Sequence, residues 1–524
     1  MNRTMTGRPF SLLKKIPFHL VLFAVYPVLS LYALNISEVN IQYVLRPLLV
    51  ALIIGITAFV ICWFLFKENG NLAAITGVGL LLVSSYGAVF NLLQGVTVGG
   101  VLFGRHRILL PIYLILIAVI LWQVWMIGRS RQGITNALNF MSILLLLMPV
   151  MQIVVNIGKS AGNTAPEKGR TQTTTAINSA NTMPDIYYFV LDSYGREDYI
   201  REYMDFDNSG FIGDLKELGF FVGDCSLSNY AFTRLSLAST LNMDYLENLS
   251  GTFPQESNDA TLLDDLIVNS KVRKTLSEAG YSSVAFETGY PFTEMSDAEY
   301  YFQPNKQPLK MAAKSPFEVM VINNTIAGGL SSIPFFKQWF GGFPYLEKYQ
   351  RQRFIIEQVK SIPQLPGSKF AFIHLVTTHR PYIFQSDGSI LYDENYYKND
   401  GVPADENYYT RGYQYQLEYT NRYMLDLIKT ILADSSMPPI IIIQGDHGVR
   451  DPGRLSILNA IYPGSDPEEF YPSITPVNTF RVILNKLGLG KFDLLPDRSY
   501  YSNANKSPYK LVEINGSPAD CKIR

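Results

Sequence analysis

Carboxylate and imidazole side chains lie at the ends of apolar runs in the C-terminal part of this 524-residue chain. Asp192 ends the run "IYYFVLD", and Asp446 and His447 follow the four isoleucines of "PIIIIQGDHG". His374 and His379 fall in "KFAFIHLVTTHRPY", so three of the chain's five histidines lie at predicted strand ends. Two carboxylates and an imidazole are a ligand set suited to a divalent metal ion.

A hydroxyl group is expected beside this set. The segment "SNYAFTRLSLAST" becomes helical at about Leu235, which places Thr233 near a helix N-terminus, where free N–H groups favour an anion. A divalent ion there would lower the pKa of the threonine hydroxyl and neutralise a phosphate or sulfate oxygen, as group transfer requires. Ser236 and Ser239 remain alternative hydroxyls on this segment. Arg234 either holds an anion as a substrate-binding residue or forms a surface salt bridge.

The elements that must position these residues alternate between strands and helices. Strands are expected in "DIYYFVLDSYG", "KFAFIHLVTTHRPY" and "IIIIQGDHG", and helix–strand pairs in "SGFIGDLKELGFFV" and "NSKVRKTLSEAGYSSVAFET". The segment "YQLEYTNRYMLDLIKTILADS" has apolar residues at helical spacing. This alternation predicts an α/β domain with a mostly parallel central sheet, whose ligands bind at the carboxyl ends of the strands.

The N-terminal part has the composition of a membrane domain. Its five apolar runs each approach the length of about 20 residues that crosses a bilayer. They are Phe18–Leu34, Leu48–Phe66, Leu72–Leu93, Ile108–Ile127 and Leu138–Ile157. We expect a transmembrane helical domain at 1–157, a flexible polar linker at 158–183 and a catalytic domain at 184–524.

The basic residues of the short loops favour a cytoplasmic N-terminus. Five crossings of the inner or cytoplasmic membrane then place the catalytic domain outside the cytoplasm. The net charge of −1 argues against a nucleic-acid partner. Whether Cys225 and Cys521 form a disulfide stays open.

Five motifs in this order resemble the alkaline phosphatase and sulfatase superfamily. They are "YYFVLDSYG", "NYAFTRLSLAS", "HLVTTHRPY", "QGDHG" and "ITPVNTFRVILNKLG". Together with the N-terminal apolar runs they are most similar to membrane-bound phosphotransferases, such as lipoteichoic acid synthases and phosphoethanolamine transferases.

The resemblance implies roles for individual residues. Asp192, Asp446 and His447 match metal ligands, and Thr233 matches the nucleophile, which also ligates the metal. His379 matches a histidine that contacts the substrate or leaving group. His374 falls in the same motif as a substrate-binding candidate.

The chain also departs from parts of the superfamily. It lacks the C/S-x-P-x-R motif of classical sulfatases at Thr233, so hydrolysis through formylglycine is not expected. No histidine follows His447, so a second metal site would lack a usual ligand, and we expect one ion: Mn²⁺, Mg²⁺ or Zn²⁺.

The sequence therefore predicts a membrane-anchored, metal-dependent transferase. It would move a phosphoryl-linked headgroup from a membrane lipid donor to a cell-surface glycan or lipid acceptor. The alternatives are a phosphate- or sulfate-ester hydrolase of the same fold and a non-catalytic protein of envelope assembly.

Overall fold

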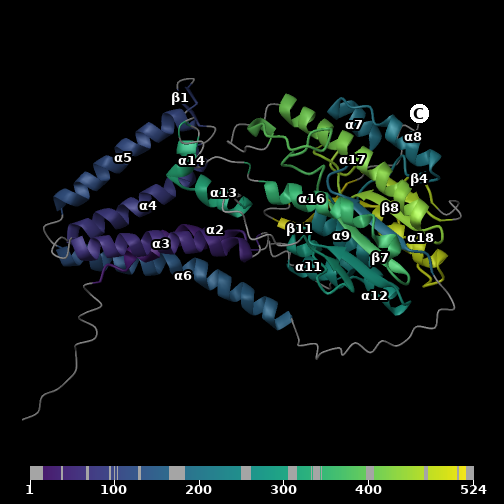
Figure 1. The fold of residues 1–524 in the computed structure, drawn as a ribbon, viewed down its shortest axis with the longest axis horizontal. Coiled ribbons are helices and arrows are strands. Elements are labelled where there is room, and N and C mark those ends of the chain that lie inside the picture. The colour runs from purple at the N-terminus through teal and green to yellow at the C-terminus, as the bar shows by residue number, and fades with distance from the viewer. Residues whose placement is uncertain are drawn as a thin grey trace, which may run out of the picture. The chain divides into compact units, whose positions relative to one another are not determined.

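In a computed structural model the chain forms two compact units (Figure 1). The helical unit comprises Met1–Thr175 together with Leu309–Leu346, and the sheet unit contains Ala176–Pro308 and Glu347–Asn399 as well as most of the C-terminal part. The structure describes residues 16–36, 39, 41–65, 70–93, 96–98, 101–102, 104–127, 131–163, 183–249, 261–304, 315–331, 333, 335, 343, 345–396, 406–451, 453–464, 470–503 and 507–514. Most of the predicted linker and Cys521 lie outside these residues.

Five helices make up most of the helical unit. They are α2 (His19–Leu34), α3 (Gln42–Leu65), α4 (Gly70–Leu93), α5 (His106–Ile127) and α6 (Arg131–Asn163), and a short hairpin, β1 (Thr97–Val98) and β2 (Val101–Leu102), lies between α4 and α5. Four of them, α3 to α6, are long and apolar enough to cross a membrane, which indicates a membrane protein. The first of the five predicted crossings, α2, has only 16 residues. Helix α6 continues into the predicted linker as far as Asn163.

Close packing surrounds the short helix α2, which contacts α3, α4 and α6. At Gly77 of α4, a Cβ atom would lie 2.5 Å from the His19 ring, so only glycine leaves room for this histidine. The buried His19 ring is 2.8 Å from Asn139 Oδ1 and 3.1 Å from the carbonyl oxygen of Ala73. Polar contacts inside the bundle thus fix α2 despite its length.

Two helices from the C-terminal part belong to the helical unit. These are α13 (Pro316–Asn323) and α14 (Ile326–Ser331), which Figure 1 shows beside the membrane helices. We call them the docking insertion. Glu318 caps α13 through Ser315 and also forms a two-pronged ion pair with Arg46 of α3. The Gly87 amide of α4 donates to the carbonyl oxygen of Asn324 at 3.1 Å.

The docking insertion contacts one end of the bundle. Its partners lie in the C-terminal halves of α2 and α4 and near the beginning of α3; they are Tyr32, Tyr86 and Arg46. Glycine makes the approach possible, because a Cβ on Gly87 would come within 2.4 Å of the insertion's backbone. The sequence did not predict this insertion, since its two helices have only eight and six residues and are much shorter than a membrane crossing.

The Arg46–Glu318 ion pair is expected to hold the docking insertion on the bundle. The two side chains are only 31% and 11% exposed, so Arg46→Met leaves the Glu318 carboxylate without its partner. We expect a loss of about 1–3 kcal/mol in the free energy of unfolding, measured by thermal unfolding in detergent. Arg105→Met, at an exposed arginine before α5, is the control and should leave the melting temperature unchanged. Equal melting temperatures for both variants would contradict the prediction.

The sheet unit is a seven-stranded sheet between two layers of helices. The strand order is β4 (Phe221–Val222), β9 (Asn459–Tyr462), β8 (Ile440–Gly445), β3 (Ile186–Leu191), β7 (Lys369–Leu375), β5 (Ser282–Phe286) and β6 (Tyr300–Phe302). All described strand pairs of this sheet are parallel except the two that β9 makes, which confirms the predicted fold class. A separate hairpin consists of β10 (Ser499–Asn503) and β11 (Ser507–Ile514).

Helices cover both faces of the sheet, as Figure 1 shows. One layer contains α7 (Glu197–Met204), α8 (Ser209–Glu217), α16 (Leu346–Val359) and α17 (Glu406–Asp434). The other contains α9 (Thr233–Asn242), α11 (Thr261–Val268), α12 (Lys271–Glu278) and α18 (Pro476–Lys486), which bury the main hydrophobic core. Because β3, β7 and β8 are buried along their whole length, their sequences are apolar without alternation.

Candidate metal centre

Three adjacent strands bring the predicted ligands to one edge of the sheet. In the parallel register Leu191 pairs with both Leu375 of β7 and Gly445 of β8, so Asp192 and Asp446 leave the sheet at the same level. The structure places ligand atoms of Asp192, Asp446 and His447 within 4.8 Å of one another, and all three residues are buried. The predicted convergence of strand ends is therefore present.

Backbone and hydroxyl donors orient the two carboxylates. The Ser193 amide donates to Asp446 Oδ1 at 3.0 Å, and the Ser193 hydroxyl donates to Asp192 Oδ1 at 3.1 Å. Ser193 has a φ of 63°, a left-handed conformation that directs its amide back to β8. The other oxygen of Asp446, Oδ2, is buried without a hydrogen-bond partner among the described residues and faces the cluster.

The ring of His447 is oriented by its own turn. Its Nδ1 lies 2.8 Å from the Gly448 carbonyl oxygen, and because a carbonyl only accepts, Nδ1 carries the proton. Nε2 then presents a lone pair to the two carboxylates. Both glycines of "QGDHG" are required by close backbone contacts, since a Cβ would lie 2.4 Å from the Tyr194 oxygen at Gly445 and 2.1 Å from the Gly453 oxygen at Gly448.

Thr233 is the first residue of α9, as the sequence predicts. Its hydroxyl oxygen lies 3.3 Å from His447 Nε2. The N-cap residue, Phe232, has no polar side chain, so the first amides of α9 are not capped from within the helix. The rival hydroxyls have other partners: Ser236 lies 3.1 Å from the Ser228 hydroxyl, and Ser239 donates to the carbonyl oxygen of Asp244 at 2.7 Å.

The spacing of these atoms fits a divalent ion. Around His447 Nε2, the Thr233 hydroxyl lies at 3.3 Å, Asp446 Oδ2 at 3.5 Å and Asp192 Oδ1 at 3.8 Å. These separations exceed the usual hydrogen-bond length of about 2.9 Å. Bonds of about 2.0–2.1 Å to a tetrahedral ion would separate its ligands by about 3.3–3.4 Å. The donor set and its unpartnered oxygen therefore match a cation site.

The two other histidines lie close to Asp192. The fully buried His374 places Nε2 at 3.4 Å from Asp192 Oδ2 and Nδ1 at 3.2 Å from the Thr293 hydroxyl. His379 follows β7, and its Nδ1 lies 2.5 Å from the Arg380 carbonyl oxygen. Burial lowers the pKa of His379 below its ordinary value, although the Asp192 charge opposes this shift. Burial alone would raise the pKa of Asp192, but His379, His374 and His447 hold this pKa below its usual range.

Arg234 is engaged away from the ligand cluster. Its Nε lies 2.9 Å from Asp264 Oδ1, and its guanidinium lies 4.4 Å from the centre of the Phe292 ring. Of the two alternatives left open by the sequence, these contacts favour the salt bridge over substrate binding.

Arg454 approaches the cluster from the loop after β8 and was missed by the sequence interpretation. Its Nη2 lies 3.5 Å from His447 Nε2, and its Nε donates to the Ala231 carbonyl oxygen at 2.9 Å. Its place seven residues after His447, in the loop that leaves a site strand, is the signal that could have identified it.

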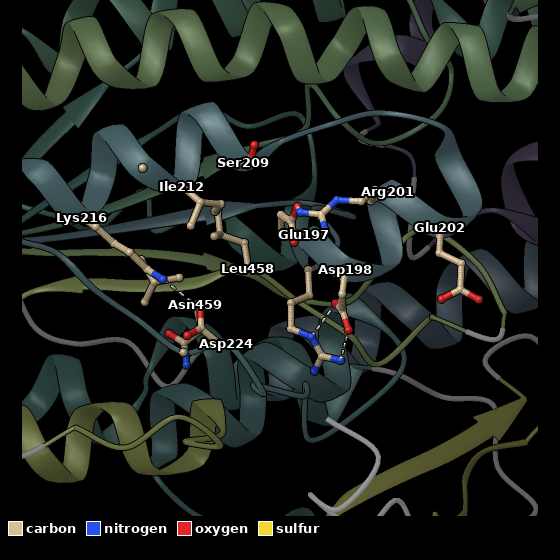
Figure 2. A pocket seen from close by; sticks show the side chains of 14 residues that line it. Glu197, Asp198, Arg201, Glu202, Ser209, Ile212, Lys216, Asp224, Leu458 and Asn459 are labelled. Atoms are coloured by element: carbon tan, nitrogen blue, oxygen red, sulfur yellow. Dashed lines mark hydrogen bonds and ion pairs between the residues drawn. The ribbon is translucent and has the colours of Figure 1, made fainter. Parts of the chain in front are cut away.

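A pocket on the same unit lies apart from these residues. It has a volume of about 870 Å³ and is lined mainly by residues of α7 and α8 (Figure 2). Its charges largely neutralise each other: Asp198 accepts from Arg196 at 2.8 Å, and Lys216 lies 3.3 Å from Asp224. None of the predicted site residues lines it.

Elsewhere on this unit Cys225 is in a disulfide, whereas Cys62 of the helical unit is a free thiol.

A mostly parallel sheet, an Asp–Asp–His cluster at its carboxyl edge and a threonine at a helix N-terminus agree with the superfamily that the motifs resemble. No protein-family profile and no curated protein sequence matches this chain. Solved structures do. The C-terminal periplasmic domain of EcEptC from Escherichia coli, in complex with Zn, matches with 13% identity, a TM-score of 0.40, and coverage of 64% of this chain and 94% of that one.

Two further structures match over similar ranges. The C-terminal periplasmic domain of phosphoethanolamine transferase EptC from Campylobacter jejuni has 14% identity and a TM-score of 0.34, covering 59% of this chain and 90% of that one. The lipoteichoic acid synthase LtaP from Listeria monocytogenes has 12% identity and a TM-score of 0.35, covering 62% and 76%.

Proposed function

We propose that this protein is a membrane-anchored, metal-dependent transferase that moves a phosphoryl-linked headgroup from a lipid to a cell-surface glycan. The observation that carries the proposal is the position of Thr233, whose hydroxyl lies 3.3 Å from His447 Nε2 at the edge of the Asp192–Asp446–His447 cluster. A nucleophile, an anion-binding helix N-terminus and a cation site coincide there.

One divalent ion, held by Asp192, Asp446, His447 and Thr233, would lower the pKa of the threonine hydroxyl and neutralise charge on phosphorus-bound oxygens. The imidazole ligand favours Zn²⁺ among the candidates Zn²⁺, Mn²⁺ and Mg²⁺.

The chain's own residues account for the two chemical steps. In the first, Thr233 Oγ1 forms a bond to phosphorus, the bond from phosphorus to the diacylglycerol oxygen breaks, and the proton of the threonine hydroxyl passes through His379 to this leaving oxygen. In the second, an acceptor hydroxyl attacks phosphorus, the bond to Thr233 breaks, and the acceptor's proton passes through neutral His379 to Thr233 Oγ1. The amides of α9 and the guanidinium of Arg454 offer donors to the phosphoryl oxygens.

The helical unit supports a lipid donor and an external site. The beginnings of α2, α4 and α6 meet, because the His19 ring contacts both Ala73 and Asn139. The three helices therefore run in the same direction, and α6 ends, at Asn163, on the side of the bundle that the docking insertion contacts. With α2 as a crossing, this side lies opposite the N-terminus, which supports a site outside the cytoplasm.

The proposal is tested with the full-length protein in vesicles whose phospholipid carries labelled phosphate in its headgroup. We expect a labelled peptide that contains Thr233, and chase of the label to an added glycan acceptor. If the label reaches only free headgroup phosphate and never the glycan, the protein is a hydrolase and not a transferase. An unlabelled protein without bound metal would favour a non-catalytic role in envelope assembly.

A further inference from the structure

A buried lysine lies beside the candidate site on a helix that the motifs do not include. Lys348, in the first turn of α16, is 8% exposed, and its Nζ donates to the carbonyl oxygens of His379 at 2.8 Å and Pro381 at 3.2 Å. An ammonium group is costly to bury without a counter-charge. Among the residues that the structure describes, no carboxylate lies within ion-pair distance of Lys348.

A second polar side chain projects from the same face of α16. Gln352 lies one helical turn after Lys348, is fully buried, and accepts from the Val376 amide at 2.9 Å through Oε1. The two side chains therefore hold the backbone of the segment Val376–Pro381 at both ends. This segment leaves β7 at the carboxyl edge of the sheet and carries His379.

A second buried lysine lies at the opposite end of β7 and serves as a comparison, because its role is structural. Lys369, at the beginning of the strand, is 4% exposed and pairs with Asp185 at 2.9 Å. It is charge-balanced and remote from the strand end where the site lies. Lys369 also donates to the carbonyl oxygen of Leu365 at 2.8 Å, whereas Lys348 donates to the main chain of the turn that carries His379.

We propose that Lys348 is a positioning residue that clamps the Val376–Pro381 turn and so places His379 for proton transfer at the metal centre. The proposal rests on the function proposed above for its chemical role, but the clamp itself is defined by geometry alone. Burial lowers the pKa of His379, the Asp192 charge opposes this shift, and Lys348 adds to it. Burial also lowers the pKa of Lys348 itself to about 7, so the clamp rests on its hydrogen bonds and not on its charge.

The first test is a double-mutant cycle in the full-length protein with the labelled phospholipid. We expect Lys348→Met to lower kcat by about 10²-fold with KM and metal content nearly unchanged, because a misplaced catalytic group costs about that much. Lys348→Arg should recover part of the loss. Lys348→Met combined with His379→Ala should be no slower than His379→Ala alone, since the two residues act as a unit.

Lys369→Met is the matched control for burial of a lysine. It should lower the melting temperature. In the double variant, the fold-losses in kcat from Lys369→Met and His379→Ala should multiply, because the two residues act independently. If the losses from Lys348→Met and His379→Ala multiply in the same way, the positioning role is wrong. Loss of the metal ion from Lys348→Met would also overturn it.

The second test does not depend on activity. Hydrogen exchange of full-length Lys348→Met should be at least about tenfold faster than wild type in peptides covering 376–381, and unchanged in peptides of β8. Unchanged exchange at 376–381 overturns the clamp, whatever the protein's substrate. If exchange at 376–381 is faster but the protein never transfers label, the clamp is supported and only the proposed function is contradicted.

Discussion

Asp446→Asn is expected to yield a folded protein that has lost both its divalent ion and its activity. An asparagine keeps the acceptor for the Ser193 amide but loses the charge that Asp446 Oδ2 presents to the cluster. Changes outside the first ligand shell of a metal cost about 10–100-fold in affinity, so loss of a direct ligand should cost at least about 10³-fold. Elemental analysis of the purified protein and thermal unfolding measure the two parts of this result.

The matched control for this variant is Asp451→Asn. Asp451 follows the same strand, but it is exposed, and within the described part of the chain it accepts from the Tyr501 hydroxyl alone, at 3.0 Å. This variant should keep its metal ion and its activity. Full metal content in Asp446→Asn would show that the cluster is a hydrogen-bonded turn rather than a metal centre.

Thr233→Ala is expected to lower kcat by at least about 10⁴-fold and to abolish labelling of the protein, because loss of a covalent nucleophile removes the whole reaction path. Thr233→Ser retains the hydroxyl and should keep measurable activity. Peptide mass spectrometry of the labelled protein identifies the modified residue.

Ser236→Ala and Ser239→Ala are the controls on the same helix. Both hydroxyls have partners away from the cluster, so these variants should retain transfer and labelling at Thr233. Labelling that persists in Thr233→Ala and disappears in either serine variant would move the nucleophile to that serine.

Much of the candidate site could be predicted because its geometry follows from strand ends. Asp192, Asp446 and His447 come directly after continuous apolar runs, and parallel neighbours end at the same edge of a sheet. The sequence predicted a helix from about Leu235 with Thr233 near its N-terminus, and α9 begins two residues earlier, at Thr233 itself. The residues that meet at this edge of the sheet could therefore be predicted from the ends of the apolar runs and the start of one helix.

The remaining features depend on contacts between segments far apart in the chain. Arg234 pairs with Asp264, and Lys348 reaches the His379 turn from a different helix. No local pattern indicates which partner such a charge will find. The order of the seven strands is of the same kind, because each apolar strand could pair with several others, and helix packing selects among them.

The docking insertion has a consequence for how the protein is made. Helices α2 to α6 leave the ribosome first, but Glu318 and Asn324, which bind Arg46 and Gly87, follow much later in the chain. The second helix of the docking insertion ends at Ser331, so both of its helices can pack on the bundle only after 331 of the 524 residues have been synthesised. Until then, the end of the bundle that they contact lacks its cover.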